Sequence, residues 1–351
     1  MVVPVVLNAH EPIAYSITID ALPALSYDRP IAIVTNSTVW ALHESYVLKR
    51  IRAPKIETIV VPDGEQYKTI ETVLEILDRL FTERFDRQSL LIAVGGGVIG
   101  DMTGFAASLY QRGIGFVQIP TTLLSQVDAS VGGKTGVNNQ WGKNLIGAFY
   151  QPEAVYIDPH FLSTLPAREF SAGVAEVIKM AVMFDADLFR YLQGCDLRTD
   201  VAIQEMIRRS VTLKARVVNL DEKEAGIRAV LNYGHTFGHV IESETGYTTW
   251  LHGEAVAMGM VMANALAVEL DLLSSAEAEE IEALLKRNGL PTRYTVRDTE
   301  AFYNHFFLDK KSRAGAIRFV LPSGEIGTHT FRDAVDETHV KHVLAQFEDA
   351  K

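Results

Sequence analysis

Short apolar runs alternate with longer amphipathic runs through the first half of the sequence. The runs with the composition of buried strands are IAIVT from Ile31, ETIVVP from Glu57, SLLIAV from Ser89, FVQIP from Phe116 and AVYID from Ala154. Between the second and third of these, TIETVLEILDRLF from Thr69 has the 3.6-residue periodicity of a helix. Strands that alternate with helices form parallel sheets covered on both faces, so we expect an α/β fold here.

The second half of the sequence, from about Pro166, has mainly helical periodicity. VAIQEMIRRSVTLKARVV and AEAEEIEALLKRNGL are the clearest helices, and only AIRFVLP and THTFR near the end resemble strands. A chain of 351 residues is long enough for two domains of ordinary size. We therefore expect one domain over residues 1–166 and a second, mainly helical domain over residues 167–351.

A glycine-rich turn follows the apolar run SLLIAV. It is GGGVIGD, which places Gly95, Gly96, Gly97 and Gly100 at the entry to a helix expected over residues 102–110. Glycines at a strand-to-helix turn let the backbone approach a pyrophosphate, and the helix N-terminus favours its negative charge. The spacing departs from the dinucleotide fingerprint G-x-G-x-x-G, so a tight turn without a ligand is the alternative.

A second glycine-rich segment, VDASVGGKTGVNNQWGKNLIGAF, carries Asp128, Lys134, Lys143 and Asn144. Lysines in such loops commonly meet phosphates as point charges. The G-x-x-x-x-G-K-[ST] spacing of a nucleotide-binding P-loop is absent from the segment. Kinase-like chemistry is therefore disfavoured.

Three histidines lie close together in LNYGHTFGHVIESETGYTTWLHGE. His235 and His239 are four residues apart and would share one helix face, and a turn at Gly246 could return His252 toward them. A catalytic zinc site usually has three protein ligands, often two histidines and one carboxylate. The spacing does not choose among the candidate carboxylates, which are Glu176, Glu242 and Glu254. The alternative is that these histidines are ordinary surface or core residues.

The chain is acidic, with a formal net charge of −11 at pH 7. This charge argues against a nucleic acid or an anionic membrane as the main partner. An anionic substrate must then be attracted by locally grouped basic residues, and the candidates are Lys179, Lys214, Arg228, Lys310 and Lys311. Together they indicate a pocket for a small molecule that carries a phosphate and a carboxylate.

The sequence also indicates a compartment. Cys195 is the only cysteine, so no intrachain disulfide can form, and MVVPVVLNAH lacks the basic start and long apolar core of a signal peptide. The weakly polar run over residues 255–270 is too short to cross a bilayer and predicts a buried helix. We therefore expect a cytoplasmic protein without a membrane partner.

Several of these segments occur together in one order along the chain. They are GGGVIGD, QIPTTLLSQVDASVGGKTGVN, GKNLIGAFYQP, LPAREF, GVAEVIK, LNYGHTFGH, LHGEAVA and DKK. In these segments the chain resembles the 3-dehydroquinate synthase family of sugar phosphate cyclases. The resemblance implies a Rossmann-like NAD domain, a largely helical metal-binding domain and a homodimer.

The resemblance also assigns roles to single residues. It implies that one divalent metal ion, zinc or cobalt, is held by Glu176, His235 and His252. His239 is then not a ligand, because its counterpart lies near the substrate phosphate and assists proton transfer beside an acid that matches Glu224. The residues implied to contact the substrate are Asp128, Lys134 and Lys179, which are also catalytic, and Arg112, Lys214, Arg228, Asn232 and one of Lys310 and Lys311. Among them, the arginine at position 112 matches one that reaches the phosphate site of the partner subunit.

The NAD contacts implied by the resemblance are spread over six segments. At the ribose-binding position after the first strand this chain has Asn36, where the family can carry an acid. The other implied contacts are Glu65, Lys68, Gly96, Gly97, Val98, Asp101, Thr121, Thr122, Leu124, Lys143, Asn144, Thr164, Leu165 and Glu169.

The reaction implied by the resemblance starts from 3-deoxy-D-arabino-heptulosonate 7-phosphate. NAD transiently oxidises one hydroxyl, phosphate is eliminated, the hydride returns, and ring opening with an intramolecular aldol closure gives 3-dehydroquinate. The alternatives are another cyclase, which would make 2-deoxy-scyllo-inosose or a valiolone, and a metal-dependent polyol dehydrogenase that releases NADH. A catalytically silent relative would be expected to have lost a ligand or a lysine, and none of the matched positions has.

Overall fold

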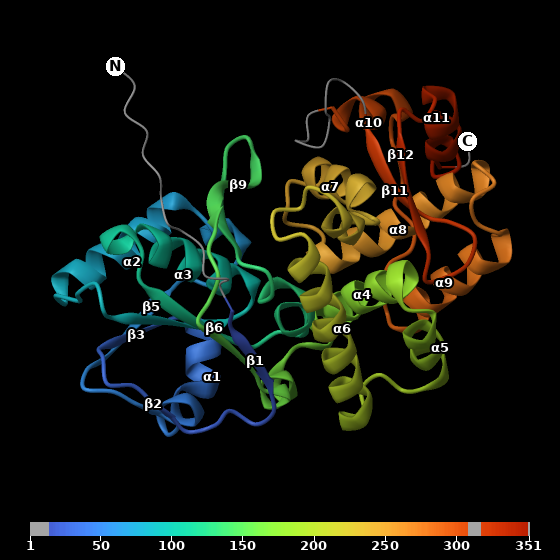
Figure 1. Cartoon of the computed structure of the whole chain (residues 1–351). Coiled ribbons are helices and arrows are strands. Elements are labelled where there is room, and N and C mark those ends of the chain that lie inside the picture. Colours follow the sequence, from blue (N-terminus) through green and yellow to red (C-terminus); the bar gives the residue numbers. More distant parts are fainter. Residues whose placement is uncertain (1–13, 308–316, 350–351) are drawn as a thin grey trace, which may run out of the picture. The chain divides into compact units, whose positions relative to one another are not determined.

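The computed structural model describes residues 14–307 and 317–349 (Figure 1). The chain forms two compact units. The sheet unit comprises the described residues up to Pro120 together with Gly133–Asp158, and the helical unit comprises Thr121–Gly132 and the described residues from Pro159 onward. These units differ from the predicted domains, 1–166 and 167–351, in residues 121–132 and 159–166, which pack with the helical unit. The domain bounds themselves stay a prediction.

The sheet unit is built on six strands that all run parallel. Their spatial order is β1-β10-β7-β6-β3-β5. The strand bounds are β1 Ser16–Ile19, β3 Ile31–Asn36, β5 Ile56–Val61, β6 Leu90–Gly95, β7 Gly115–Pro120 and β10 Ala154–Ile157. Two further residue pairs, β2 Leu25–Ser26 and β4 Ile51–Arg52, form a small parallel ladder. The α/β fold with a parallel sheet is confirmed.

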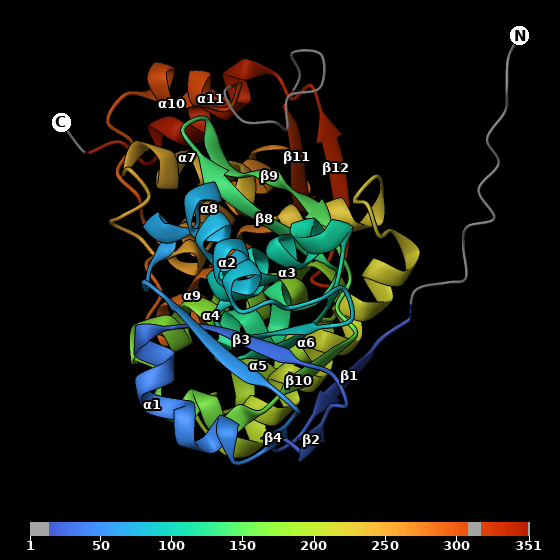
Figure 2. The ribbon, with the colours of Figure 1, turned by 90° about the vertical axis from the view of Figure 1, so that its left-hand side faces the viewer.

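Helices cover both faces of this sheet. Figures 1 and 2 show α2 (Ile70–Thr82) and α3 (Gly97–Leu109) on one face and α1 (Ser37–Leu48) on the other. The prediction for α3 was partly wrong, because the helix starts five residues before the expected start at residue 102. Its glycines at positions 100 and 104 lie on the buried face, where they allow close packing. In the sequence alone, the first of these, Gly100, belongs to the expected glycine-rich turn.

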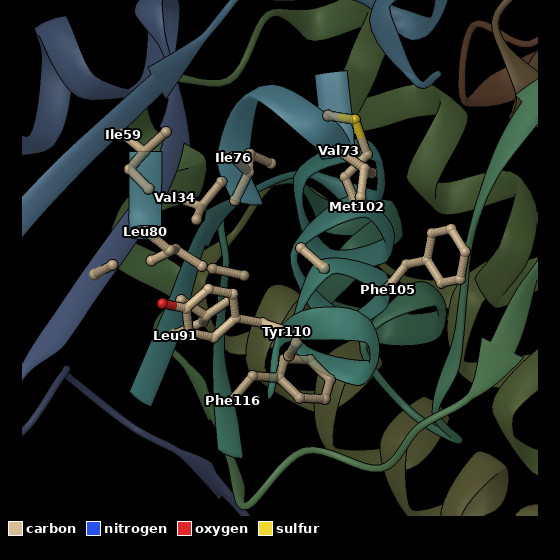
Figure 3. Close-up of a cluster of buried hydrophobic side chains, with 14 of the residues drawn as sticks. Val34, Ile59, Val73, Ile76, Leu80, Leu91, Met102, Phe105, Tyr110 and Phe116 are labelled. Carbon is tan, nitrogen blue, oxygen red and sulfur yellow. The ribbon is translucent and has the colours of Figure 1, made fainter. Parts of the chain in front are cut away.

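A cluster of buried apolar side chains lies between the sheet and the helices α2 and α3 (Figure 3). The strands contribute Val34 and Leu91, and α2 contributes Ile76 and Leu80, all fully buried. The α2 residues are four apart, so they lie on one face of the helix. Packing of that face onto the sheet fixes the carboxyl ends of the strands, from which the glycine-rich turn projects.

An antiparallel hairpin, β8 (Lys134–Asn139) and β9 (Gly142–Phe149), completes the sheet unit. These strands were not predicted from the sequence, because the segment is glycine-rich. At Gly147 a Cβ atom would lie 2.1 Å from the backbone oxygen of Thr135, which is far inside contact distance. Glycine is therefore required here by the close approach of the two strands, and it does not mark a loop.

The helical unit begins with short turns and contains eight α-helices in its described part. The short elements are the π-helix η3 (Ser125–Ala129) and the 3₁₀ helices η4 (Pro159–Thr164) and η5 (Ile227–Asn232). The helices are α4 Ala167–Phe184, α5 Ala186–Gly194, α6 Asp200–Leu220, α7 His235–Glu244, α8 His252–Glu269, α9 Ser275–Arg287 and α10 Thr299–His305, followed after the undescribed residues by α11 Glu337–Ala345.

The two predicted strands of the second half pair as the antiparallel β11 (Arg318–Pro322) and β12 (His329–Asp333). The expected buried helix over residues 255–270 is confirmed as the main part of α8, most of whose residues are buried. Within the described ranges, no helix combines the length and the apolar character needed to span a membrane.

The packing of α2 generates a matched test of the core. Leu80 is fully buried and Leu74, on the same helix, is 51% exposed. Leu80→Ala should lower the free energy of unfolding by about 2–5 kcal/mol, because it removes transfer free energy and leaves a cavity. Leu74→Ala should change it by only about 0.5 kcal/mol or less. Urea denaturation followed by circular dichroism measures both; equal losses would show that α2 does not pack as described.

Candidate metal centre and active site

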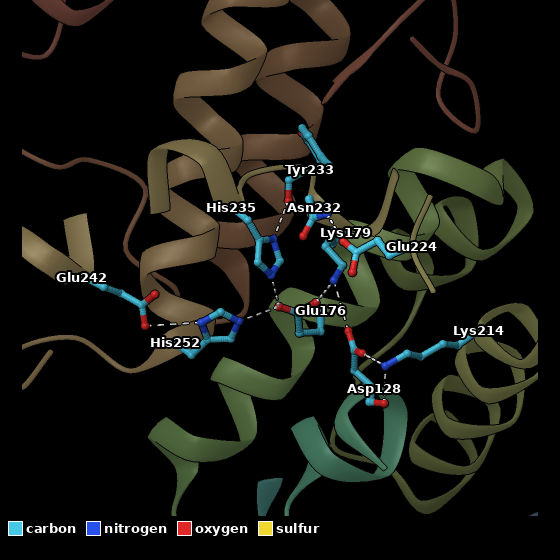
Figure 4. A network of polar contacts seen from close by, with 10 residues as sticks. All are labelled: Asp128, Glu176, Lys179, Lys214, Glu224, Asn232, Tyr233, His235, Glu242 and His252. Atoms are coloured by element: carbon cyan, nitrogen blue, oxygen red, sulfur yellow. Dashed lines mark hydrogen bonds and ion pairs between the residues drawn. The ribbon is translucent and has the colours of Figure 1, made fainter. Parts of the chain in front are cut away.

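Three ligand-type side chains converge in the helical unit. Glu176 lies on α4, His235 is the first residue of α7, and His252 is the first residue of α8. One ligand atom from each lies within 4.8 Å of the others. The Nε2 atoms of His235 and His252 are 3.8 and 3.6 Å from Glu176 Oε1 (Figure 4). Of the carboxylates that the spacing left open, Glu176 is the one placed between the two imidazoles.

This donor set fits a divalent metal ion. Glu176 is only 1% exposed, and its Oε1 atom accepts no hydrogen bond from any residue that the structure describes. Burial raises the pKa of Glu176 above its ordinary value even though Lys179 lies beside it. A carboxylate oxygen and two imidazole nitrogens are the ligands that catalytic zinc commonly takes, and a cation among them would favour the ionised carboxylate.

Local backbone geometry brings the two histidines together. Gly234 has φ of 77°, and α7 starts at the next residue. Gly246, with φ of 65°, lies in the short connection between α7 and α8, as the sequence predicts. The ring centroids of His235 and His252 are 5.1 Å apart as a result.

Glu254, the third candidate carboxylate, has a different partner. Arg168 donates to it through Nε at 2.7 Å and Nη2 at 2.6 Å, and also reaches the backbone oxygen of Thr249 at 2.9 Å. The same carboxylate accepts from the backbone N–H of Leu251 at 2.8 Å, which caps the start of α8. This two-point contact between Arg168 and Glu254 joins the N-terminus of α8, where His252 lies, to the first turn of α4.

Gly253 permits the close approach of the same two helices. A Cβ atom at this position would lie 2.0 Å from the backbone oxygen of Ala172, one helical turn before Glu176. The two ligand-bearing helices are therefore in backbone contact beside the centre. The placement of His252 relative to Glu176 depends on that contact.

A row of alternating charges continues from Glu176, with Lys179 and Lys214 buried and the Asp128 side chain 17% exposed. The Glu176 carboxylate pairs with Lys179, which also donates to Asp128 Oδ2 at 3.1 Å, and Asp128 in turn pairs with Lys214 (Figure 4). Burial acts to raise the pKa of Asp128, but Lys179 and Lys214 outweigh it and hold that pKa well below its ordinary value. Burial also lowers the pKa of Lys214, with Asp128 offsetting part of the effect.

The loop before α7 brings further predicted residues together. Arg228 is 2% exposed and donates to the backbone oxygens of Glu222 and, at 3.0 Å, Gly132. Asn232 donates to the carboxylate of Glu224. The loop itself is held by the Asp221 carboxylate, which accepts three backbone N–H groups from residues 225, 226 and 228.

His239 lies beside the metal cluster without belonging to it. Its ring centroid is 5.5 Å from that of His235 and 6.4 Å from that of His252. The ligand-type group that the described residues form consists of the other three side chains. This position agrees with a role near the centre other than metal ligation.

In the sheet unit, four of the residues predicted to contact NAD form one polar network. Lys68 is buried and donates to Asp101 Oδ2 and to Asn144 Oδ1, both at 2.6 Å. Asn138, which the sequence analysis missed, joins the network by donating to Glu65 Oε1 at 2.8 Å. Burial acts to lower the pKa of Lys68, but the carboxylates of Asp101 and Glu65 raise it above its ordinary value.

Asn36 ends β3 and caps α1, because its Oδ1 accepts from the backbone N–H of Val39 at 2.8 Å. Its amide donates to Asp63 Oδ1 at 2.8 Å. An acid is therefore present next to the position where the family can carry one, but it comes from the segment after β5. Only the pairing of β3 with β5 reveals this neighbour.

The remaining predicted residues lie at the ends of elements. Gly96, Gly97 and Val98 form the start of α3, Thr121, Thr122 and Leu124 precede η3, Lys134 and Lys143 lie on the hairpin, and Thr164, Leu165 and Glu169 lie between η4 and the first turn of α4. Arg112 has φ of 68° in the turn after α3. Lys310 and Lys311 lie outside the described residues.

Comparison with known sequences agrees with this arrangement. Family models described as 3-dehydroquinate synthase N-terminal and 3-dehydroquinate synthase C-terminal match residues 58–172 and 173–312. A 3-dehydroquinate synthase of Sulfurovum sp. (strain NBC37-1) is 67% identical over 349 residues, which are 99% of each chain.

Two solved structures of cyclases are also similar. A 2-epi-5-epi-valiolone synthase from Streptomyces hygroscopicus subsp. jinggangensis 5008, with NAD⁺ and Zn²⁺ bound, has a TM-score of 0.88 and 28% identity, covering 97% of this chain and 98% of that one. A 2-deoxy-scyllo-inosose synthase complexed with carbaglucose-6-phosphate, NAD⁺ and Co²⁺ has a TM-score of 0.81 and 25% identity, covering 91% of each chain.

The contact between α4 and α8 generates a prediction. Gly253→Ala should push the start of α8 away from Ala172 and weaken zinc binding by about tenfold, which corresponds to about 1.4 kcal/mol. Gly194→Ala is the control, because a Cβ atom there meets nothing within 4 Å. Zinc affinity is measured by competition with a chromophoric chelator. Parent affinity in Gly253→Ala would show that the helix contact does not position His252.

Proposed function

The chain belongs to the 3-dehydroquinate synthase family, and from this premise we propose that it converts 3-deoxy-D-arabino-heptulosonate 7-phosphate to 3-dehydroquinate and phosphate. The observation that carries the proposal is the row of charges from the metal cluster through Lys179 and Asp128 to Lys214. It supplies a metal site and buried cations next to each other, as a reaction that oxidises a hydroxyl and releases a phosphate requires.

Glu176, His235 and His252 are the proposed ligands of a zinc or cobalt ion. When bound, the ion supplies Lewis acidity that lowers the pKa of a substrate hydroxyl next to it. The chain's own part is to hold the three donors. Because Glu176 is buried and paired with Lys179, its carboxylate is oriented before the substrate arrives.

NAD is the proposed second cofactor, and when bound it would supply reversible hydride transfer, so that it would not be consumed. The start of α3 offers backbone N–H groups at a helix N-terminus, where a pyrophosphate is favoured. The network of Lys68, Asp101 and Asn144 lies in the same unit and supplies polar groups for the rest of the dinucleotide. The proposed contacts are those that the resemblance implies.

The proposed role of Lys179, Lys214 and Arg228 is to bind the anionic groups of the substrate. In the helical unit these cations are buried, so a carboxylate or phosphate that replaces their internal partners would meet them with little intervening water. Such fixed contacts hold the open chain near the geometry of the aldol closure, and positioning of this kind contributes several kcal/mol to an intramolecular reaction.

Proton transfer near the substrate phosphate is assigned to His239, with Glu224 as the acidic neighbour that the resemblance implies. His239 lies next to the ligands without being one of them, which supports a role beside the metal rather than on it. The Asn232 amide donates to Glu224 and orients that carboxylate. Lys134, Lys310 and Lys311 complete the proposed substrate contacts.

A homodimer is proposed together with a role for Arg112 in the partner's phosphate site. Two consecutive non-glycine residues, Gln111 and Arg112, have positive φ values of 52° and 68°. A backbone held in this sparsely populated region is typical of functional sites. The cytoplasmic location remains a prediction from the cysteine content.

The neighbouring cyclases are the second candidate class. The chain is 28% identical to the valiolone synthase and 25% identical to the inosose synthase, against 67% to the 3-dehydroquinate synthase of Sulfurovum sp.. Buried Lys214 and Arg228 also favour a substrate that carries a carboxylate in addition to its phosphate.

The ligand assignment can be tested by metal analysis. Alanine at Glu176, His235 or His252 should remove bound zinc and abolish turnover. His239→Ala should retain zinc and lose rate, because His239 lies outside the ligand group. An empty His239→Ala protein together with a zinc-loaded His252→Ala protein would contradict the assignment.

The reaction can be tested by product identification. Incubation with the heptulosonate phosphate, NAD and zinc should yield 3-dehydroquinate and phosphate without a net rise in NADH absorbance. Sedoheptulose 7-phosphate, which lacks the carboxylate, should be a poor substrate. Efficient cyclisation of sedoheptulose 7-phosphate would move the chain to the neighbouring cyclases, and stoichiometric NADH release would favour a dehydrogenase.

A further inference from the structure

Glu242 lies directly behind the proposed ligand His252. It is on the second turn of α7, is 1% exposed, and its Oε1 atom lies 3.4 Å from His252 Nδ1. The other ring nitrogen of His252, Nε2, points to Glu176 Oε1 at 3.6 Å. Figure 4 shows the imidazole between the two carboxylates. Glu242 therefore faces the ring nitrogen of His252 that is turned away from Glu176.

The two histidine ligands are oriented in different ways. His235 Nδ1 contacts the backbone oxygen of Tyr233 at 3.1 Å, and the His235 side chain is only 11% exposed. A backbone carbonyl and tight packing thus fix that ring. His252 is 33% exposed on its side chain, so packing restrains it less, and the partner of its Nδ1 is a side chain.

We propose that Glu242 is a positioning residue for the metal centre. Its carboxylate accepts the Nδ1 hydrogen of His252, which fixes the tautomer, presents the Nε2 lone pair to the metal and makes that nitrogen more basic. Glu242 is not itself a ligand, because it lies across the ring from Glu176. This inference rests on the proposed metal centre and adds a residue that holds one of its ligands.

The burial of Glu242 supports a specific role. A carboxylate is seldom buried without a charged or hydrogen-bonding partner, because its desolvation is unfavourable. The His252 ring supplies a donor at this position, and its own orientation is fixed in return. The pair also links the second turn of α7 to the first residue of α8, across the connection that contains Gly246.

The test compares three variants by zinc affinity and by the visible absorption spectrum of the Co²⁺-loaded protein. Glu242→Ala should bind zinc about 10- to 100-fold more weakly and should change the Co²⁺ spectrum, because His252 loses its orientation. Glu242→Gln should be weakened less than Glu242→Ala, because the amide oxygen still accepts the Nδ1 hydrogen but carries no charge.

Glu244→Ala is the matched control. Glu244 is on the same helix, and it pairs with Tyr294 and His305 at 2.7 and 3.3 Å. This variant should retain the parent zinc affinity and the parent spectrum. A loss of affinity in Glu244→Ala equal to that in Glu242→Ala would overturn the proposal, because the effect would then belong to the helix and not to the contact with His252.

Two further outcomes decide the question. Parent affinity and an unchanged Co²⁺ spectrum in Glu242→Ala would overturn the role of Glu242 while leaving the metal centre intact. Zinc retained by His252→Ala would instead overturn the metal centre itself. If Glu242→Ala fails to fold, Glu242→Gln decides. Weaker zinc binding in a Glu242→Gln protein that unfolds at the same temperature as the parent supports the proposal, and unchanged zinc binding contradicts it.

Discussion

The burial of the Glu176 carboxylate is the constraint on which the rest of the helical unit depends. A charge taken out of water is tolerated only where opposite charges and donors surround it. Lys179 on the next turn of the same helix satisfies one side, and the imidazoles of His235 and His252 face the other. Because Lys179 is also buried, it needs Asp128, and the row of charges extends from the metal cluster to Lys214.

The same requirement explains the packing of three helices. The histidines reach Glu176 because each is the first residue of a helix, where the chain enters from a turn. The contact of Gly253 with α4 and the two-point contact between Arg168 and Glu254 hold one of those helix starts in place. A metal site of fixed geometry needs such supporting contacts, since its ligands come from three separate segments.

The two units attract anions by different physical means in the proposed reaction. In the sheet unit, parallel strands deliver a glycine-rich turn to a helix N-terminus, and the attraction for an anion comes mainly from the backbone. In the helical unit, the attraction comes from buried side-chain charges that are already paired with each other. A chain with a net charge of −11 can therefore still bind a doubly anionic substrate.

Local patterns in the sequence determined five of the six strands of the sheet, several of the helices and the types of residue at the centre, because periodicity and composition act over a few neighbouring residues. They missed the edge strand β1. They did not reveal the hairpin of β8 and β9 or the early start of α3, where glycine serves close packing. Nor did these patterns choose the metal ligand among Glu176, Glu242 and Glu254. The resemblance to the family made that choice. Only the tertiary structure showed that Glu242 contacts His252 and that Glu254 contacts Arg168. The contacts of a side chain depend on how α4, α7 and α8 pack against each other.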